Sequence, residues 1–159
     1  MATLETRRAL ITDATSVSRL CLLLGYDCTE ALMRQRIAKL RDDPNHAIFV
    51  AAIDGAEVVG WVHVETRMPL TGKPFADIVA LVVSATHRRL GIGRALAERV
   101  VAWAQIQQLS TIHARAQEHR EDALTFYEGL GYALYKEHQV YRRVLDGPDD
   151  TGGTPTIVD

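Results

Sequence analysis

The sequence predicts a mixed α/β domain in three layers, with helices on both faces of a mixed central sheet. Three observations predict it: a hairpin pattern over residues 47–65, a nearly all-apolar stretch over residues 75–83, and a helical pattern that begins at Gly91. A stretch that is apolar at almost every position suits a central strand covered on both faces. A strand that follows this helix should pair with the central strand in parallel, through a right-handed crossover.

Two amphipathic helices are expected between a first strand at residues 6–11 and the hairpin. The first helix covers residues 12–24, where apolar residues recur at helical spacing. Thr12 or Asp13 can cap its N-terminus, and Gly25 ends it.

The second helix should begin after Thr29, a good N-cap residue. It should end at Asp43-Pro44-Asn45, because the residue before a proline disfavours the helical region. Four apolar residues at helical spacing should form its buried side: Leu32, Met33, Ile37 and Leu40.

The hairpin should turn at Asp54-Gly55, which is a strong signal for a two-residue loop between strands. A polar, proline-bearing loop at residues 66–74 then leads into the central strand.

The C-terminal part of the chain alternates helices and strands. The helix from Gly91 should bury four residues at steps of four, four and three: Ile92, Leu96, Val100 and Trp103. Residues 111–116 alternate apolar and polar positions, which predicts a half-covered strand. A short helix within residues 120–132 should end at Gly129 and Gly131. Its inward face should consist of Leu124 with Tyr127 or Phe126.

Residues 132–145 are expected to form one bent or two short closing strands. From Asp146 the sequence is rich in Gly, Pro and acidic residues and has no periodicity, which predicts a mobile tail over residues 146–159. The sequence therefore predicts a single domain over residues 1–145, in a chain of 159 residues that is long enough to bury a core.

Composition narrows the class of protein. The net charge of −2 gives no global basic field for nucleic acid, so any anion site must come from a local arrangement. Cys21 and Cys28 are too few for a disulfide scaffold, and two reduced thiols are expected. The N-terminus resembles neither a signal peptide nor a membrane span, so we expect a cytoplasmic protein that does not contact a membrane. The histidines show no zinc spacing, and no metal is expected.

The stretch HRRLGIGRAL, residues 87–96, combines two glycines, flanking arginines and the start of a helix. A helix N-terminus has amides without internal partners and carries partial positive charge. Glycines let the backbone take unusual angles and let a ligand come close. Such a loop can bind phosphate oxygens. A Walker A loop is excluded because Gly-Lys-Ser/Thr is absent, and the third position of a Rossmann fingerprint is Leu96 rather than Gly or Ala.

The pattern that remains is R/Q-x-x-G-x-G/A. The run Arg88-Arg89-Leu90-Gly91-Ile92-Gly93 resembles the pyrophosphate-binding motif of the GCN5-related N-acetyltransferase (GNAT) superfamily. REDALTFYEGLGY, residues 120–132, resembles that family's C-terminal A-x-x-FYE-x-LGF/Y segment. The resemblance covers roughly residues 4–145, since the order of elements also matches. It implies an acetyl-CoA-dependent N-acetyltransferase with acetyl-CoA as cosubstrate.

The resemblance also implies roles for particular residues. In the family, the pantetheine arm pairs with the end of the central strand, here Leu81, Val82 and Val83, and an amide at Leu81 or Val82 polarises the thioester carbonyl. The pyrophosphate lies on the amides of Arg89 to Arg94, and Phe126 joins the cofactor site. Tyr127 matches the tyrosine that protonates the departing thiolate. The other interpretation of Tyr127 is a core aromatic at helical spacing.

The sequence departs from the family at the general base, because Val79 and Ala80 stand where many members have a carboxylate. Asp77 through a water is one alternative, and other candidates are His63, Glu65, Glu118 and His119. A low-pKa amine would need no dedicated base. Many relatives have an asparagine where this chain has Arg120, which either pairs with a phosphate or faces water.

The acceptor is expected to be a primary amine of a small molecule or peptide. Acidic residues near the first two helices and the 66–74 loop favour a cationic amine: Asp27, Glu30 and Glu65. Two other function classes remain open, a catalytically silent acyl-CoA-binding regulatory domain and a nucleotide-binding protein. A homodimer is also open, since the apolar closing strands offer an edge that could pair.

Overall fold

The computed structural model describes residues 2–116 and 121–147. Its sheet has five strands in the order β1-β2-β3-β4-β5. β1 to β4 are antiparallel neighbours, and β5 runs parallel to β4. The mixed sheet and the parallel pair confirm the expectations from sequence. The strands are β1 (Leu4–Arg8), β2 (His46–Ile53), β3 (Glu57–Arg67), β4 (Phe75–Val83) and β5 (Ile112–Ala114).

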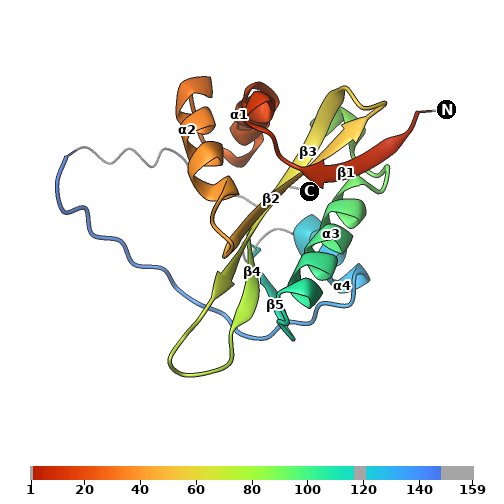
Figure 1. The fold of residues 1–159 in the computed structure, drawn as a ribbon. Coiled ribbons are helices and arrows are strands. Elements are labelled where there is room, and N and C mark those ends of the chain that lie inside the picture. The colour runs from red at the N-terminus through yellow and green to blue at the C-terminus, as the bar shows by residue number, and fades with distance from the viewer. Residues whose placement is uncertain (1, 117–120, 148–159) are drawn as a thin grey trace.

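Helices cover both faces of the sheet, which confirms the three-layer α/β fold (Figure 1). One face carries α1 (Ala14–Cys21) and α2 (Glu30–Arg41), and the other carries α3 (Ile92–Ile106) and α4 (Glu121–Gly129). Three single turns of 3₁₀ helix complete the order of elements: η1 (Ile11–Asp13), η2 (Leu22–Leu24) and η3 (Ala85–His87).

The sheet divides the core into two apolar clusters, because successive side chains of a strand point to opposite faces. Val62 and Leu81 pack under α3 with Leu96. Trp61 and Val82, their chain neighbours, pack under α1 and α2. The four α3 residues expected to be inside are all buried.

The residues expected at two helix ends lie where the sequence predicts them. Gly25 ends the first helical segment with a φ of 84°, in the left-handed region that glycine tolerates. The Thr29 hydroxyl accepts a hydrogen bond from the Leu32 amide at 3.2 Å. Asp13 stands at the N-cap of α1, but its carboxylate turns back to accept from the Leu10 amide and the Arg7 guanidinium, both at 2.7 Å.

Two core predictions are wrong by one helical position. Leu32 is 44% exposed, whereas Met33 and Ile37 are buried. Leu124 is 38% exposed, and the inward positions of α4 are Ala123 and Tyr127. In both helices the buried pair is spaced by four residues, and a neighbour one residue away is rotated by about 100° from that face.

The predicted strands within residues 132–145 are absent, because residues 133–147 form neither helix nor strand. A strand needs a neighbour for its backbone hydrogen bonds, and this segment leads away from the β5 edge in Figure 1. The predicted tail begins at Asp146, and its residues 148–159 lie outside the described residues.

Two further observations concern the described residues 2–116 and 121–147. None of their helices is long and apolar enough to cross a membrane. Both cysteines are free thiols. Burial, with the nearby Cys28, raises the pKa of the Cys21 thiol to about 12, which keeps it protonated at neutral pH.

Candidate functional site

β4 changes its pairing halfway along its length. On its β3 side, His63 faces Ala80 but Val64 faces Ile78, so Val79 is an extra residue in β4. At this bulge Val79 is 41% exposed, whereas most other residues of β4 are buried. Bulges bend a strand and re-aim its side chains, and they are frequent next to active sites.

On its β5 side, β4 has a strand partner over its first half. The parallel pairing begins at Ala76 with Ile112 and ends at Ile78 with Ala114. Beyond Ile78, residues 79–83 have no partner strand on this side among the described residues. The two strands therefore separate just where the bulge occurs, and this free backbone leads into the glycine loop.

The glycine loop shapes the start of α3. Gly91 is the N-cap residue with a φ of 80°, and Arg89 also has a positive φ, of 65°. No side chain caps the helix, and its first turn contains no acidic residue. The first-turn amides thus have neither an intrahelical partner nor a side-chain acceptor, which suits an anion.

Gly93 has a different role from Gly91. A Cβ at Gly93 would lie 3.0 Å from two atoms of the Phe126 ring. That distance is shorter than ordinary carbon contacts. Glycine at this position therefore lets α3 and α4 approach closely, whereas Gly91 provides the left-handed turn.

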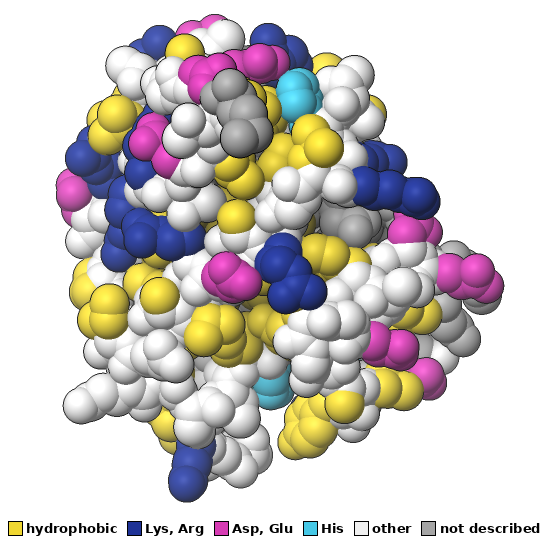
Figure 2. Space-filling model, turned by 90° about the vertical axis from the view of Figure 1, so that its right-hand side faces the viewer, with side chains coloured by type: hydrophobic (Ala, Val, Ile, Leu, Met, Phe, Trp, Pro, Cys, Tyr) yellow, Lys and Arg dark blue, Asp and Glu magenta, His cyan; other side chains and the backbone are white. Residues whose placement is uncertain are grey.

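A cavity of about 670 Å³ lies between the glycine loop and α4. Figure 2 shows the side of the molecule that carries α3 and α4, on which basic side chains are interspersed with acidic and uncharged ones. No broad basic face is visible there, so anion binding would depend on the cavity itself. Its lining residues are Val83, Arg88, Arg89, Gly91, Ile92, Gly93, Arg94, Asp122, Thr125, Phe126, Gly129 and Leu130.

The structure brings most of the predicted cofactor residues to this cavity. Three predicted residues do not line it: Leu81 and Val82 are fully buried in β4, and Leu90 is 64% exposed. The sequence analysis missed the α4 residues other than Phe126. A signal was available, because the lining positions 122, 125, 126 and 129 follow the i, i+3, i+4, i+7 spacing of one helix face.

Tyr127 lies in the core beside the cavity and not among its lining residues. Its ring meets Phe126 and Tyr132 edge to face, with centroids 5.1 and 5.3 Å apart. Its hydroxyl is buried. Tyr127 is therefore separated from the cavity by the ring of Phe126, which lines it.

A polar row crosses the sheet on the face that carries α1 and α2. The strand register pairs His46 with Glu65, Glu65 with Asp77, and Asp77 with His113. Directly opposed residues share one face of a sheet, so these side chains form one row over four strands. His63 stands next to the row and faces Ala80 at the bulge.

Two histidines of this region are in hydrogen-bond contact. Nδ1 of His46 lies 3.0 Å from Nε2 of His63, and it lies 3.8 Å from a Glu65 oxygen. Nε2 of His46 lies 3.9 Å from Asp43. Burial and the neighbouring His46 lower the pKa of His63 to about 4, although Asp77 opposes the shift. His63 is therefore neutral at physiological pH, and His46 connects it to two carboxylates.

Asp77 is fully buried, yet it is paired. Nη1 of Arg115 donates to its Oδ2 at 2.6 Å, and Nη1 of Arg67 lies 3.8 Å from the same oxygen. Its other oxygen, Oδ1, is buried without a hydrogen-bond partner among the described residues. The arginines therefore engage Oδ2, and only Oδ1 is left to accept a further hydrogen bond. The remaining base candidates, Glu118 and His119, and the departure at Arg120, lie outside the described residues.

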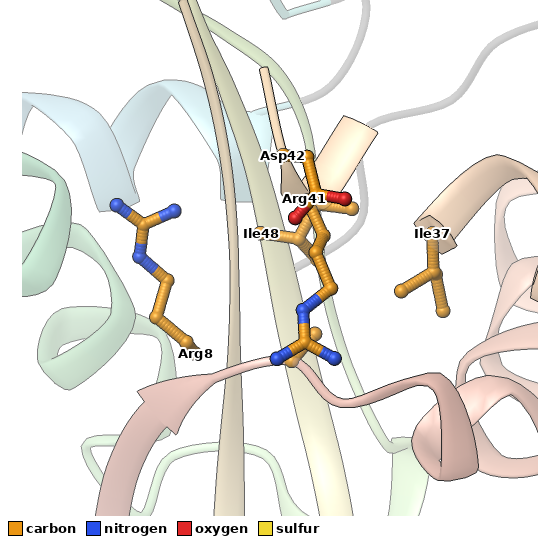
Figure 3. Close-up of a pocket in the computed structure, with 6 residues that line it drawn as sticks. Arg8, Ile37, Arg41, Asp42 and Ile48 are labelled. Atoms are coloured by element: carbon orange, nitrogen blue, oxygen red, sulfur yellow. The ribbon is translucent and has the colours of Figure 1, made fainter. Parts of the chain in front are cut away.

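A second, smaller cavity of about 350 Å³ lies where β1, β2 and the end of α2 meet. It is lined by two arginines, Arg8 and Arg41, but their side chains point apart on either side of the strands in Figure 3. Arg8 instead lies over the Phe49 ring, 5.2 Å from its centroid. The two charges do not converge, so this cavity has no evident site for an anion.

The chain is similar in sequence to known N-acetyltransferases. N-acetyltransferase 8B of Mus musculus is 32% identical over 87 residues, which make up 54% of this chain and 38% of that protein. Mycothiol acetyltransferase of Salinispora arenicola (strain CNS-205) is 33% identical over 114 residues, or 70% of this chain and 34% of that protein. The chain thus spans well under half the length of these curated relatives.

Solved structures share the fold. Aminoglycoside N-acetyltransferase AAC(6')-Iy, in complex with CoA, has a TM-score of 0.81 at 15% identity, covering 90% of this chain and 96% of that one. AAC(6')-Ih from Acinetobacter baumannii has a TM-score of 0.78 at 16% identity, covering 91% and 100%. The model of the "Acetyltransferase (GNAT) family" matches residues 16–132, which hold the bulged strand, the glycine loop and α4. With the motif, the strand separation and the helix order all inside that match, the chain belongs to the GNAT acetyltransferase family.

Proposed function

We propose that the protein is an acetyl-CoA-dependent N-acetyltransferase that moves an acetyl group to a primary amine by direct attack of the amine on the thioester. One observation carries the proposal. The second half of β4, which has no described strand partner on its β5 side, leads through the glycine loop to an uncapped helix N-terminus, and this N-terminus faces a cavity walled by α4. A thioester and a pyrophosphate in one molecule need these two binding surfaces side by side.

The glycine loop fits a pyrophosphate in both donors and space. The first-turn amides of α3 have no cap, and Gly91 adds no side chain in front of them. The helix N-terminus favours negative charge. Arg88, Arg89 and Arg94 line the same cavity. We therefore assign the pyrophosphate to the amides of Arg89 to Arg94.

The pantetheine arm is assigned to the backbone of Leu81, Val82 and Val83, between the bulge and the glycine loop. Only their backbone is needed, since the side chains are buried in the core. An amide at Leu81 or Val82 would stabilise negative charge that develops on the thioester carbonyl. Phe126 in the cavity wall would add apolar contacts, and the exposed Leu90, next to Gly91, is assigned to the same site. Acetyl-CoA would supply the reactive thioester, and the protein would supply positioning and hydrogen-bond donors.

His63 is our candidate to receive the proton of the amine. It faces Ala80 at the bulge, one residue before the assigned amides. Its ring is neutral at physiological pH, so one ring nitrogen has a lone pair that can accept a proton, and its lowered pKa makes it a weaker base than an ordinary histidine. Nε2 of His63 can hand a proton to Nδ1 of His46, which lies near Glu65 and Asp43.

The activity is tested by incubating the protein with acetyl-CoA and a panel of amines, followed by mass spectrometry. The panel holds aminoglycosides, polyamines, amino acids and peptide N-termini. Mass detection avoids background in a thiol assay from Cys28, a free thiol that is only partly buried. We expect one class to gain one acetyl group in an enzyme-dependent manner. CoA binding without any product would count against transfer and for an acyl-CoA-binding domain.

Tyr127 is our candidate acid for the departing thiolate, and Tyr127→Phe tests it. We expect kcat to fall by roughly 100-fold with unchanged affinity for acetyl-CoA, since general acid catalysis contributes about 100-fold or more. Tyr132→Phe is the matched control, because Tyr132 is a half-buried tyrosine whose ring packs on Tyr127. It should keep kcat within about twofold. Equal kcat values for the two variants would return Tyr127 to a purely structural role.

A further inference from the structure

Two arginines lie beside the polar row of the sheet. Nη1 of Arg115 lies 2.6 Å from Oδ2 of Asp77, and Nη1 of Arg67 lies 3.8 Å from the same oxygen. Both guanidinium groups thus reach one buried carboxylate, yet the two side chains are 59% and 51% exposed. Each arginine is tied to the row through one nitrogen, while much of its side chain meets solvent.

Both arginines lie on the same face of the sheet as His63, the candidate base. Alternate residues of a strand share a face, and His63, Glu65 and Arg67 alternate along β3. Arg115 follows β5 directly, and its contact with Asp77 brings its guanidinium to this face. An amine that gives its proton to His63 therefore lies on the face that carries the two arginines.

The two guanidinium groups have hydrogen-bond donors to spare. An arginine carries five N–H donors in a planar fork that matches a carboxylate. Arg115 approaches Asp77 through Nη1, and Arg67 approaches Glu65, at 3.4 Å, and Asp77 through its own Nη1. Nε and Nη2 of both side chains have no hydrogen-bond acceptor among the described residues. These donors are available to a carboxylate from outside the chain.

The acids of the row are already paired with cations of the chain. Asp77 meets both arginines, and Glu65 lies 3.4 Å from one of them. Asp43 lies at the opposite end of the row, 3.9 Å from His46. Lys136 adds positive charge at the β5 end. The row thus offers a polycation no unpaired acidic cluster among the described residues, whereas an anion finds arginine donors that are left over.

We infer that the acceptor amine carries a carboxylate, which Arg67 and Arg115 bind, so that the acceptor is an amino acid or a short peptide with a free C-terminus. This inference rests on the proposed acetyl transfer and names its substrate class. Arginine–carboxylate pairs combine charge with fixed geometry. Aminoglycosides and polyamines carry no carboxylate and would leave both arginines without this partner.

The spacing along β3 suits one small molecule. Glu65 lies two residues from His63, which is about 7 Å along a strand. Nη1 of Arg67 reaches back to Glu65 at 3.4 Å, so its guanidinium lies at the level of Glu65 rather than beyond it. A carboxylate on Arg67 and an amine at His63 are then close enough to belong to the same amino acid or dipeptide.

Matched acceptor pairs test the inference with the full chain. Each amino acid and dipeptide is compared with its C-terminal amide, which keeps the shape and removes the charge, and kcat/KM with acetyl-CoA is measured by mass spectrometry. We expect the free acid to exceed its amide at least about tenfold, the effect of one charged hydrogen bond. Amidation lowers the pKa of the amine and raises its reactivity, so a preference for the acid must come from binding.

Two variants assign the preference to the arginines. Arg67→Gln removes one fork, and Arg115→Lys keeps a charge beside Asp77 but removes the other fork. In each variant KM for the acid should rise about tenfold, with kcat/KM for the amide within about twofold of the wild type. Arg7→Lys is the matched control, because Arg7 also pairs with a buried aspartate, Asp13, at 2.7 Å. It should leave the acid-to-amide ratio unchanged.

The outcomes separate this inference from the proposed function. Product formed with equal kcat/KM for acid and amide would overturn the inference and leave acetyl transfer standing. So would an aminoglycoside or polyamine that reacts with a higher kcat/KM than every acceptor that bears a carboxylate. An acid-to-amide ratio that both arginine variants leave unchanged would also overturn it. No product with any amine would remove the proposed function, and this inference with it.

Discussion

The two halves of β4 meet different surroundings. The first half, up to Ile78, pairs with strands on both sides and carries Asp77, a fully buried charge in a row of polar side chains. The second half is entirely apolar, lacks a described partner on the β5 side and leads into the glycine loop. The bulge at Val79 separates the two halves.

This difference suggests how one strand could contribute to the binding of both acetyl-CoA and the amine. In the proposed reaction the second half binds the cofactor through its backbone, so its side chains are free to fill the core. The first half carries Asp77, which lies on the same face of the sheet as His63, the candidate base of the proposed reaction. His63 and Ala80 stand at the boundary between them. Variants on either side of the bulge should therefore change different measured quantities.

The largest effect is expected at the glycine loop. Gly91→Asp places a carboxylate at the helix N-terminus in a left-handed conformation, so it adds both repulsion toward a pyrophosphate and backbone strain. We expect CoA affinity, measured by calorimetry, to fall on the order of 100-fold, which is about 2.7 kcal/mol. Gly91→Asn is the matched control, since asparagine has the same shape without the charge and tolerates this conformation. Similar affinities for the two variants would contradict the assigned pyrophosphate site.

The next effect is expected in the polar half of β4. Asp77→Asn removes the charge that Arg115 binds at 2.6 Å, and the free energy of unfolding should fall by about 2 kcal/mol. Glu65→Gln is the control, because Glu65 pairs with Arg67 at 3.4 Å in a more exposed setting and should lose less than about 1 kcal/mol. Urea denaturation measures both. Equal losses in the two variants would show that the buried pair of Asp77 stabilises the protein no more than the exposed pair of Glu65.

The smallest of these effects is a pH dependence. His63 has a pKa of about 4 when folded and 6.5 as an ordinary histidine, so the unfolded chain binds more protons between these values. Stability from this group is complete above pH 6.5 and is lost as pH falls toward 4, by up to about 2 kcal/mol between pH 6.5 and 5. His63→Gln and His63→Phe should both reduce the change of the urea denaturation midpoint with pH over that range. The two variants pack differently, but neither can titrate at this position. If both keep the pH dependence of the wild type, another group causes it.

Much of the fold could be predicted because its signals are local. Gly25 and Thr29 act through the backbone of their own helix ends, and the nearly all-apolar run of β4 indicates a strand covered on both faces. The glycine loop could be predicted for the same reason. Gly91 and Gly93 occupy fixed places relative to one helix start.

The polar row could not be predicted as a unit, because its members come from four strands. Asp77 and His113 become neighbours only through the register of β4 and β5. Leu32 and Leu124 were misplaced since one residue of helix rotation decides between core and solvent. The prediction of closing strands within residues 132–145 was wrong for another reason. Sequence reports the tendency of Val140 and Tyr141 to join a sheet, and it does not report whether a neighbouring strand is within reach.

The bulge at Val79 also acts as a change of phase along β4. Before it, the even-numbered residues Ala76 and Ile78 point toward α3, and after it the odd-numbered residues Leu81 and Val83 do. If the same sequence formed a regular strand without the bulge, Leu81 would face the opposite layer and Val82 would lie under α3. The bulge thus shifts the alternation of the two faces by one residue, so the strand enters the glycine loop with Val83 packed beneath the helix that the loop begins.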